Sequence, residues 1–204
     1  MPNLLHIDCS PRAASVSSHL AGAFVARWEQ QNPLGTVVHR NTSLEMTPYL
    51  DQTMAEAFLT SAAELNAEQK QALAYSDRLV DELLVADVIV FGVPMWNLSI
   101  PASLKAWIDL VVREGRTFAF TQQGVAPLVP RGKKVYVFSA RGGSYSFDSP
   151  LHDLDYQEPY LRTILGLIGL SDIEFVRAER QSESPEAAAE SLRRAEAVLE
   201  ALAS

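Results

Sequence analysis

The stretch VIVFGVPMWN, Val88–Asn97, decides the fold class and predicts where a ligand binds. Its first six residues, Val88–Val93, form an apolar run that is rich in β-branched side chains and ends at Pro94. Such a run is typical of a strand buried on both faces, as in the centre of a parallel sheet. Ligands of open parallel sheets bind beyond the carboxyl ends of the strands, and the loop Pro94–Leu98 has the side chains to suit a flat, partly polar ring. The alternative is an ordinary connector whose Trp96 packs on the core.

Strand-like runs alternate with amphipathic helical patterns along the rest of the chain. Strands are predicted at Leu4–Cys9, Gly35–Asn41, Val88–Val93, Lys134–Ser139 and Ile173–Val176. Helices are predicted from Ser17 or Ser18, over Gln52–Thr60, Glu68–Leu84 and Ile100–Val112, from about Pro159 to Ile168, and from Ser184 onward. This alternation specifies one α/β domain, residues 1–204, with a parallel sheet and helices on both faces. In the strand order 2-1-3-4-5, the carboxyl ends of the first, third and fourth strands are neighbours.

Composition and charge exclude several classes of function. The chain carries a formal net charge of -8, so neither nucleic acid nor an anionic membrane is an expected partner. No apolar run approaches the ~20 residues that cross a bilayer. The single cysteine, Cys9, excludes an internal disulfide, and without a secretion signal the cytoplasm is the expected compartment. The four histidines show no metal-ligand spacing with one another or with Cys9, so no metal site is expected.

The loop after the first strand, Ser10–Ser18, is rich in hydroxyl groups. Its sequence SPRAASVSS has four serines in nine residues and leads into a helix. The N-terminus of a helix carries unpaired N–H groups and the positive end of a dipole, which together attract anions. Hydroxyls at Ser10, Ser15 and Ser17 add donors without adding charge, so the loop is a candidate phosphate cradle. Simple N-capping, for which one serine suffices, is the alternative.

A third loop, Ala140–Ser144, follows the fourth strand with the sequence ARGGS. Its adjacent glycines permit positive φ angles and a close approach of the backbone to a ligand, and their N–H groups can donate to a carbonyl or an anionic ring edge. A plain turn is the alternative. With a phosphate in the first loop and a flat ring between the other two, the arrangement is that of a site for flavin mononucleotide (FMN).

Over Leu4 to about Glu179 the chain resembles the FMN-dependent NADH:quinone oxidoreductases, also called azoreductases. The similar segments are SPRAASVSS at Ser10–Ser18, PMWNLSIPASLKAWID at Pro94–Asp109, GRTFAF at Gly115–Phe120 and ARGG at Ala140–Gly143. The resemblance implies a three-layer flavodoxin-like fold and one FMN per subunit. It also implies that the FMN-binding residues are Ser10, Ser15, Val16, Ser17, Met95, Trp96, Asn97, Leu98, Ala140, Arg141, Gly142 and Gly143.

The resemblance implies the reaction as well. NADH or NADPH reduces the flavin by hydride transfer to N5, and a quinone or an aromatic azo compound then takes two electrons in the same pocket, which is a ping-pong mechanism. No side chain is assigned as catalytic, because the flavin supplies the reactivity. Arg141 helps to stabilise the reduced ring if its side chain turns inward.

The family likeness further implies a homodimer with the active site at the subunit boundary. Phe118, Phe120 and the segment Gln52–Phe58 are therefore candidates for substrate or dimer contacts, and Tyr145 is a candidate for the substrate pocket. Phe118 and Phe120 precede a polar excursion, Gln122–Pro130, and their return to the core is the alternative.

Two other functions stay open at this point. A flavodoxin-like one-electron carrier, which binds FMN without turnover of NADH, shares the low isoelectric point and the fold. The long segment Tyr145–Tyr156 and the two phenylalanines favour the enzyme, because they suit a roofed pocket. A relative of the fold that binds no flavin is the third possibility.

Overall fold

The computed structural model describes residues 1–202, and its main sheet has the predicted parallel order. The strands are β1 (Asn3–Asp8), β2 (Thr36–Asn41), β3 (Val88–Pro94), β6 (Lys134–Ala140) and β7 (Ile173–Ala178). They are arranged as β2-β1-β3-β6-β7, and every neighbouring pair is parallel. The prediction of a five-stranded sheet in the order 2-1-3-4-5 is confirmed. The extent of the domain, residues 1–204, stays a prediction, and its last two residues lie outside the described range.

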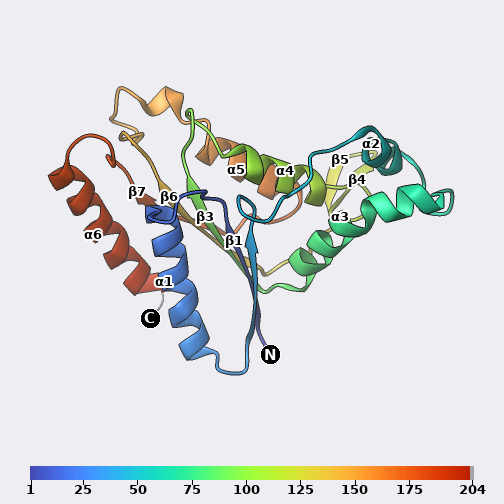
Figure 1. Cartoon of the computed structure of the whole chain (residues 1–204), viewed down its shortest axis with the longest axis horizontal. Coiled ribbons are helices and arrows are strands. Elements are labelled where there is room, and N and C mark those ends of the chain that lie inside the picture. Colours follow the sequence, from blue (N-terminus) through green and yellow to red (C-terminus); the bar gives the residue numbers. More distant parts are fainter. Residues whose placement is uncertain (203–204) are drawn as a thin grey trace.

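Helices cover both faces of this sheet (Figure 1). The helices α1 (Val16–Gln31) and α6 (Pro185–Leu202) lie on one face, and α3 (Ala67–Val85), α4 (Ala102–Val111) and α5 (Glu158–Leu167) lie on the other. A short helix, α2 (Gln52–Leu59), precedes α3, and a 3-10 turn, η1 (His152–Leu154), precedes α5. None of the helices described for residues 1–202 combines the length and apolar character that crossing a membrane requires.

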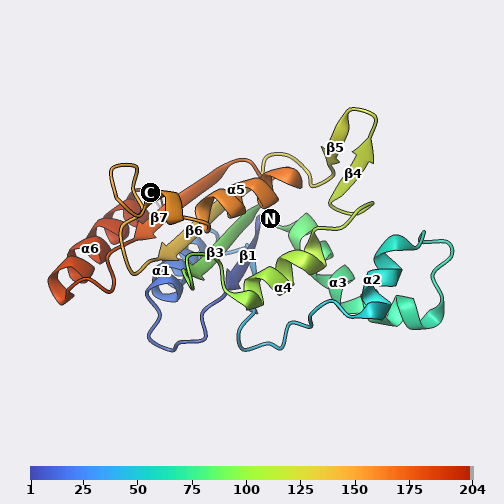
Figure 2. The same cartoon turned by 90° about the horizontal axis from the view of Figure 1, so that it is seen from above.

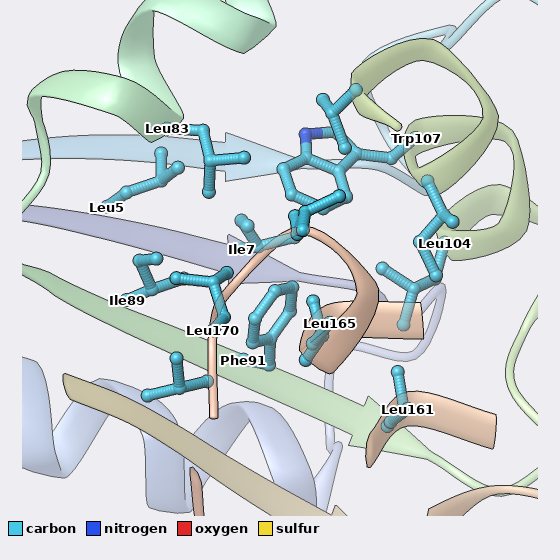
Figure 3. Close-up of a cluster of buried hydrophobic side chains, with 14 of the residues drawn as sticks. Leu5, Ile7, Leu83, Ile89, Phe91, Leu104, Trp107, Leu161, Leu165 and Leu170 are labelled. Atoms are coloured by element: carbon cyan, nitrogen blue, oxygen red, sulfur yellow. The ribbon is translucent and has the colours of Figure 1, made fainter. Parts of the chain in front are cut away.

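Two hydrophobic cores hold the three layers together. In the core under α3, α4 and α5, Phe91 of β3 meets Trp107 of α4 edge to face, with ring centroids 5.7 Å apart (Figure 3). In the core on the other face, Phe24 of α1 packs against Tyr136 and Phe138 of β6, with centroids 4.5 and 5.5 Å away. Because β3 is buried on both faces, its sequence is a continuous apolar run, and that run is what identified it as a central strand.

The segment predicted as a polar excursion after the two phenylalanines forms a second, two-stranded sheet. Strand β4 (Phe118–Thr121) pairs antiparallel with β5 (Gly124–Pro127), and the hairpin projects from the body of the molecule near α2 (Figure 2). Strands of four residues are too short to give a periodic signal in the sequence. The turn is closed by Gly124 at φ 112 and by a hydrogen bond from Thr121 Oγ1 to the Gly124 carbonyl, 2.9 Å long.

The hairpin rests on the turn that ends α5. Gly169 has φ 102, and the N–H of Leu170 donates to the Leu165 carbonyl at 3.0 Å, which is the pattern of a Schellman motif. A Cβ at Gly169 would lie 2.9 Å from Cβ of Pro127 in β5. Glycine is therefore required here both for the backbone angle and for the space under the hairpin.

Candidate functional site

Three connections meet at the carboxyl edge of the sheet: β1 to α1, β3 to α4, and β6 to α5 (Figure 1). The N–H of Cys9, just after β1, donates to the Gly92 carbonyl at 3.0 Å, and the N–H of Met95, just after β3, donates to the Ala140 carbonyl at 2.8 Å. The three predicted loops are thus joined to one another at their bases. Side chains and amides from loops far apart in the sequence are in this way gathered in one place.

The serine loop combines a helix cap with further hydroxyls. Ser15 Oγ accepts from the Ser18 N–H at 3.2 Å and lies 3.1 Å from Ser17 Oγ, and both hydroxyls are buried. Val16 and Ser17 begin α1, so their N–H groups have no partner within the helix. Ser10 Oγ accepts from the Arg12 N–H at 3.2 Å and shapes the loop between strand and helix. N-capping uses Ser15 alone, so the remaining hydroxyls and amides are what this loop can offer to an anion.

Asp8 organises the serine loop, and the sequence analysis did not single it out. Its carboxylate accepts from the Ser10 N–H at 3.1 Å, from Ser18 Oγ at 2.8 Å and from Asn41 Nδ2 at 3.3 Å. A negative charge beneath an anion site lowers its affinity, so the benefit of Asp8 lies in fixing the donors around the site. Its position as the last residue of β1 was the available signal.

Gly92 lets the start of α1 lie directly on the sheet. A Cβ at this position of β3 would be 3.2 Å from the Ser17 carbonyl oxygen, 3.3 Å from Cβ of Ala21 and 3.4 Å from Asp8 Oδ1. The glycine in VIVFGVP therefore sets how deeply the helix N-terminus sits between β1 and β3.

The loop after β3 is a tight two-residue hairpin. Trp96 and Ser99 exchange backbone hydrogen bonds of 2.9 and 3.0 Å, and the two central residues, Asn97 and Leu98, have φ of 47 and 70. Asparagine tolerates this left-handed conformation, but for leucine it is strained, and such strain concentrates at functional sites. Trp96 is 46% exposed, so the alternative in which it packs on the core is wrong.

The glycine loop after β6 is held by its carbonyl groups. The carbonyls of Arg141, Gly142 and Gly143 accept from the N–H groups of Gln181, Ser182 and Arg180, at 3.0 to 3.1 Å. Neither glycine N–H donates a hydrogen bond within residues 1–202, so both amides are available to a ligand. Neither glycine uses the positive φ that glycine permits; space requires glycine at position 143, because a Cβ there would lie 2.8 Å from Leu151 Cδ1.

The Arg141 side chain is buried and bound to acidic and amide groups. Its Nη1 lies 2.8 Å from Asp155 Oδ2, and its Nε lies 3.2 Å from Gln157 Oε1. Only 1% of the side chain is exposed. Its charge is thus balanced by carboxylates that follow it in the chain, and the sequence-based expectation of an inward turn toward a ring has no support in these contacts.

The predicted substrate residues line separate cavities. Phe118 and Phe120 line a groove of about 690 Å³ between the hairpin and the helices α2 and α3, whereas Tyr145 lines a cavity of about 680 Å³ beside α5. Trp96 and Asn97 line a third hollow, of about 480 Å³. Within one chain the structure therefore does not bring the phenylalanine pair together with Tyr145.

The titratable groups near the three loops offer little acid–base or metal chemistry. Burial raises the pKa of the Cys9 thiol far above its usual value, so Cys9 is a neutral core residue rather than a nucleophile. Among residues 1–202, no three His, Cys, Asp or Glu side chains are grouped so that they could hold a metal ion. The chemistry that the site can supply is binding by hydroxyl, amide and carboxamide groups.

Comparison with known proteins gives consistent matches over the whole length. The model of a family described as having a flavodoxin-like fold matches residues 2–202. The FMN-dependent NADH:quinone oxidoreductase of Nostoc sp. (strain PCC 7120) is 44% identical over 193 residues, which cover 94% of this chain and 93% of the relative. That of Ralstonia nicotianae is 44% identical over 198 residues, which cover 96% and 94%. The crystal structure of azoreductase from Bacillus anthracis str. Sterne has a TM-score of 0.91 and 31% identity, covering 100% of this chain and 99% of the other.

Proposed function

The chain belongs to the family of FMN-dependent NADH:quinone oxidoreductases, and from that membership we propose how its three loops serve the reaction. The protein uses FMN to pass two electrons from NADH or NADPH to quinones and to aromatic azo compounds. One observation carries this conclusion: identity of 44% to an FMN-dependent NADH:quinone oxidoreductase extends over 94% of the chain. The match with an azoreductase structure at 31% identity supports the azo substrates.

The first loop fits the phosphate of FMN. Ser10, Ser15 and Ser17 provide hydroxyls, and Val16 and Ser17 provide the N–H groups at the start of α1. Uncharged donors at a helix N-terminus can bind a phosphate dianion in a protein whose net charge is -8. Gly92 supports this assignment, because it keeps the helix end close to the sheet.

The other two loops fit the flat ring. On one side, Met95, Trp96, Asn97 and Leu98 form the tight hairpin that carries an exposed indole and a carboxamide. On the other side, Ala140 and Arg141 lead to the two glycine amides, whose carbonyls are already bound. A ring held between them has apolar surface against its face and donors at its edge.

The FMN supplies the two-electron chemistry when it is bound, and the protein binds and orients it. The amides of Gly142 and Gly143 would donate to the edge of the ring, and fixed donors of this kind cost no reorganisation during the reaction. The carboxamide of Asn97 holds the ring through a hydrogen bond. No side chain has to accept or donate a proton in the step that involves the nicotinamide.

The decisive experiment is anaerobic mixing of the FMN-loaded protein with NADH in a stopped-flow spectrometer. We expect rapid loss of the visible absorbance of the flavin without any added reductase, followed by its return when a quinone is added. Bound FMN that NADH does not bleach would contradict the proposal and select the one-electron carrier. Protein that stays colourless with added FMN would select a relative without a flavin.

The second subunit of a homodimer is the proposed occupant of the groove beside the hairpin. Phe120 is 66% exposed and Leu59 is 89% exposed at the rim of this groove, and Phe118 lies inside it. Exposed aromatic and aliphatic groups that lie together are typical of an interaction surface. The family likeness supports a second copy of this chain as the partner, and such a dimer would bring the groove of one subunit toward the flavin edge of the other.

A further inference from the structure

The guanidinium group of Arg141 connects the two ends of one long loop. This loop, residues 144–157, leaves the glycine turn and ends where α5 begins. Near its end, Asp155 Oδ2 accepts from Arg141 Nη1 at 2.8 Å, and Gln157 Oε1 accepts from Nε at 3.2 Å. The other oxygen of Asp155 accepts from the N–H groups of Gln157 and Glu158, at 2.9 and 3.1 Å, where α5 begins.

The beginning of the same loop is held by Glu179, the residue that follows β7. Its Oε1 accepts from the Tyr145 N–H at 2.9 Å, and its Oε2 accepts from Ser144 Oγ at 3.0 Å. Arg141 Nη1 lies 3.7 Å from Glu179 Oε1, within reach of a salt bridge. The two residues that come directly after Gly142 and Gly143 are therefore fixed by a carboxylate that Arg141 balances.

Charges in this cluster balance without any contribution from a ligand. Asp155, Glu158 and Glu179 face Arg141 and the outer arginines Arg162 and Arg177. Burial alone raises the pKa of Glu158, but hydrogen bonds from Arg177 and Arg162 outweigh it and hold that pKa below its usual value. Three carboxylates against three guanidinium groups leave no net charge to attract the anionic ring of a flavin.

We propose that Arg141 is a positioning residue that acts on FMN through Glu179, not by direct contact. Its guanidinium orients Glu179, Glu179 fixes Ser144 and Tyr145, and these hold the amides of Gly142 and Gly143 at the ring edge. This inference rests on the proposed function, and it assigns to Glu179 and Asp155 roles that lie outside the cofactor loops. We call Arg141, Asp155 and Glu179 together the clamp. Removal of one partner of a buried ion pair leaves the other charge buried and unpaired, so the clamp acts as a unit.

The test uses Arg141→Met and Glu179→Ala, alone and combined, with Arg162→Met as the matched control. Arg162 contacts Glu158 but neither Glu179 nor Asp155 through any ion pair or hydrogen bond in residues 1–202. Hydrogen exchange of the amides of residues 142–145 is measured in the flavin-free protein. The dissociation constant and the midpoint potential of bound FMN are measured in the loaded protein.

The clamp predicts the same defect in both single variants. Exchange at residues 142–145 becomes faster, FMN binding weakens by about tenfold, which is the effect of losing one charge-assisted hydrogen bond, and the midpoint potential falls because fewer amides stabilise the reduced ring. The double variant is no worse than Arg141→Met, because the two residues act through one contact. Arg162→Met stays within about twofold of the unmodified protein in exchange and affinity, because Arg162 is itself half-exposed and contacts neither Glu179 nor Asp155.

Other outcomes overturn the proposal. A normal exchange rate and affinity in Glu179→Ala, together with weakened binding in Arg141→Met, would mean that Arg141 does not act through Glu179. If Arg141→Met does not fold, Glu179→Ala and Glu179→Gln carry the test. Unchanged hydrogen exchange and FMN affinity in both would contradict the clamp. Failure of NADH to bleach the bound flavin of the unmodified protein would instead count against the proposed function, and the exchange and affinity results would still judge the clamp.

Discussion

Asn97 shows how one residue can serve both the backbone and a ligand. It occupies the left-handed region, φ 47, in the hairpin after β3, and its carboxamide lies at an exposed position of the candidate site. Its neighbour Leu98 adopts the same region at φ 70 without any polar group that favours it. The strain at Leu98 is therefore kept by the surrounding contacts, among them the hydrogen bond from the Tyr156 N–H to the Leu98 carbonyl, 3.1 Å long.

We predict that Asn97→Gly weakens FMN binding by about tenfold, the value of a hydrogen bond lost from a buried polar edge. Glycine accepts the left-handed backbone, so thermal stability should change little. Asn97→Ala should show the same loss of FMN and an added loss of stability from its unfavourable φ. Fluorescence titration with FMN and thermal unfolding separate the two effects, and full FMN affinity in both variants would remove Asn97 from the site.

His6 is predicted to make the protein sensitive to mild acid. Burial, and then the neighbouring His39, lower the pKa of His6 to about 4, against a smaller raising effect of Asp8. Its Nδ1 lies 3.1 Å from His39 Nδ1, and its buried Nε2 has no hydrogen-bond partner in residues 1–202. Between pH 6.5 and 4 the unfolded chain binds a proton that the folded chain excludes, so stability present above pH 6.5 is lost as the pH falls.

Urea unfolding at pH 7 and pH 5 measures this effect. From pH 7 to pH 5 the unfolding free energy of the unmodified protein should fall by about 2 kcal/mol more than that of His6→Gln. This follows from a change in unfolding free energy of about 1.4 kcal/mol per pH unit. His19→Gln is the control, because His19 is exposed, and it should keep the full slope. If the unfolding free energies of the unmodified protein and of His6→Gln change equally with pH, the pKa of His6 is not lowered in the folded protein.

At the scale of an element, α1 is the part of the fold that the phosphate loop depends on. Its N-terminus lies against β3 at Gly92, while its body packs through Leu20, Phe24 and Val25 on the sheet. The helix therefore has little freedom to move back if its first turn is pushed outward.

Gly92→Ala tests this dependence. The new Cβ meets the Ser17 carbonyl oxygen at 3.2 Å and Cβ of Ala21 at 3.3 Å, so it lifts the helix start; we expect a loss of about 1–3 kcal/mol in unfolding free energy and weaker FMN binding. Gly22→Ala, one residue further along the same helix from Ala21, is the matched control, because no heavy atom lies within 4 Å of its added Cβ. That variant should gain about 0.5–1 kcal/mol with unchanged FMN affinity. Unchanged FMN affinity in Gly92→Ala would show that phosphate binding does not depend on the position of the α1 N-terminus.

For the whole molecule, the hairpin and α2 form a surface that one chain leaves exposed. The groove between them combines Phe118, Phe120 and Leu59 with Arg113 and Arg116 at its floor and rim. Arg113 stacks over Phe58 with its Cζ 4.9 Å from the ring centroid and also binds Asp77, so the groove is pre-organised. A rigid apolar surface of this kind suits an interface between subunits.

We predict that the protein is a dimer in solution and that Phe120→Asp converts it to a monomer. A carboxylate buried at an apolar interface without a partner strongly opposes association. Light scattering coupled to gel filtration measures the mass of each form. Leu34→Asp, a substitution at a 73% exposed residue between α1 and β2, should leave the dimer intact. A monomeric unmodified protein, or a dimer that Phe120→Asp preserves, would contradict the proposed surface.

The strand order and the positions of the three loops follow from the sequence because their signals are local. A doubly buried strand is a continuous apolar run, a helix repeats its apolar face every three to four residues, and strands that alternate with helices give a parallel sheet. The hairpin of β4 and β5 could not be predicted in this way, because strands of four residues are too short to show a periodic pattern of apolar side chains. The assignment of the loop residues to FMN stays a prediction supported by family membership.

What the tertiary structure alone decided is how the polar groups pair across the chain. Tyr145 and Glu179 are 34 positions apart, and Asp8 and Asn41 are 33 positions apart, so no local pattern links them. The local pattern of residues predicts that a glycine-rich loop with an arginine lies at the ligand edge of the sheet. Folding decided that this arginine faces Asp155, Glu158 and Glu179 instead of a ligand, because a guanidinium withdrawn from water requires carboxylates around it, and β7 and the start of α5 bring them there.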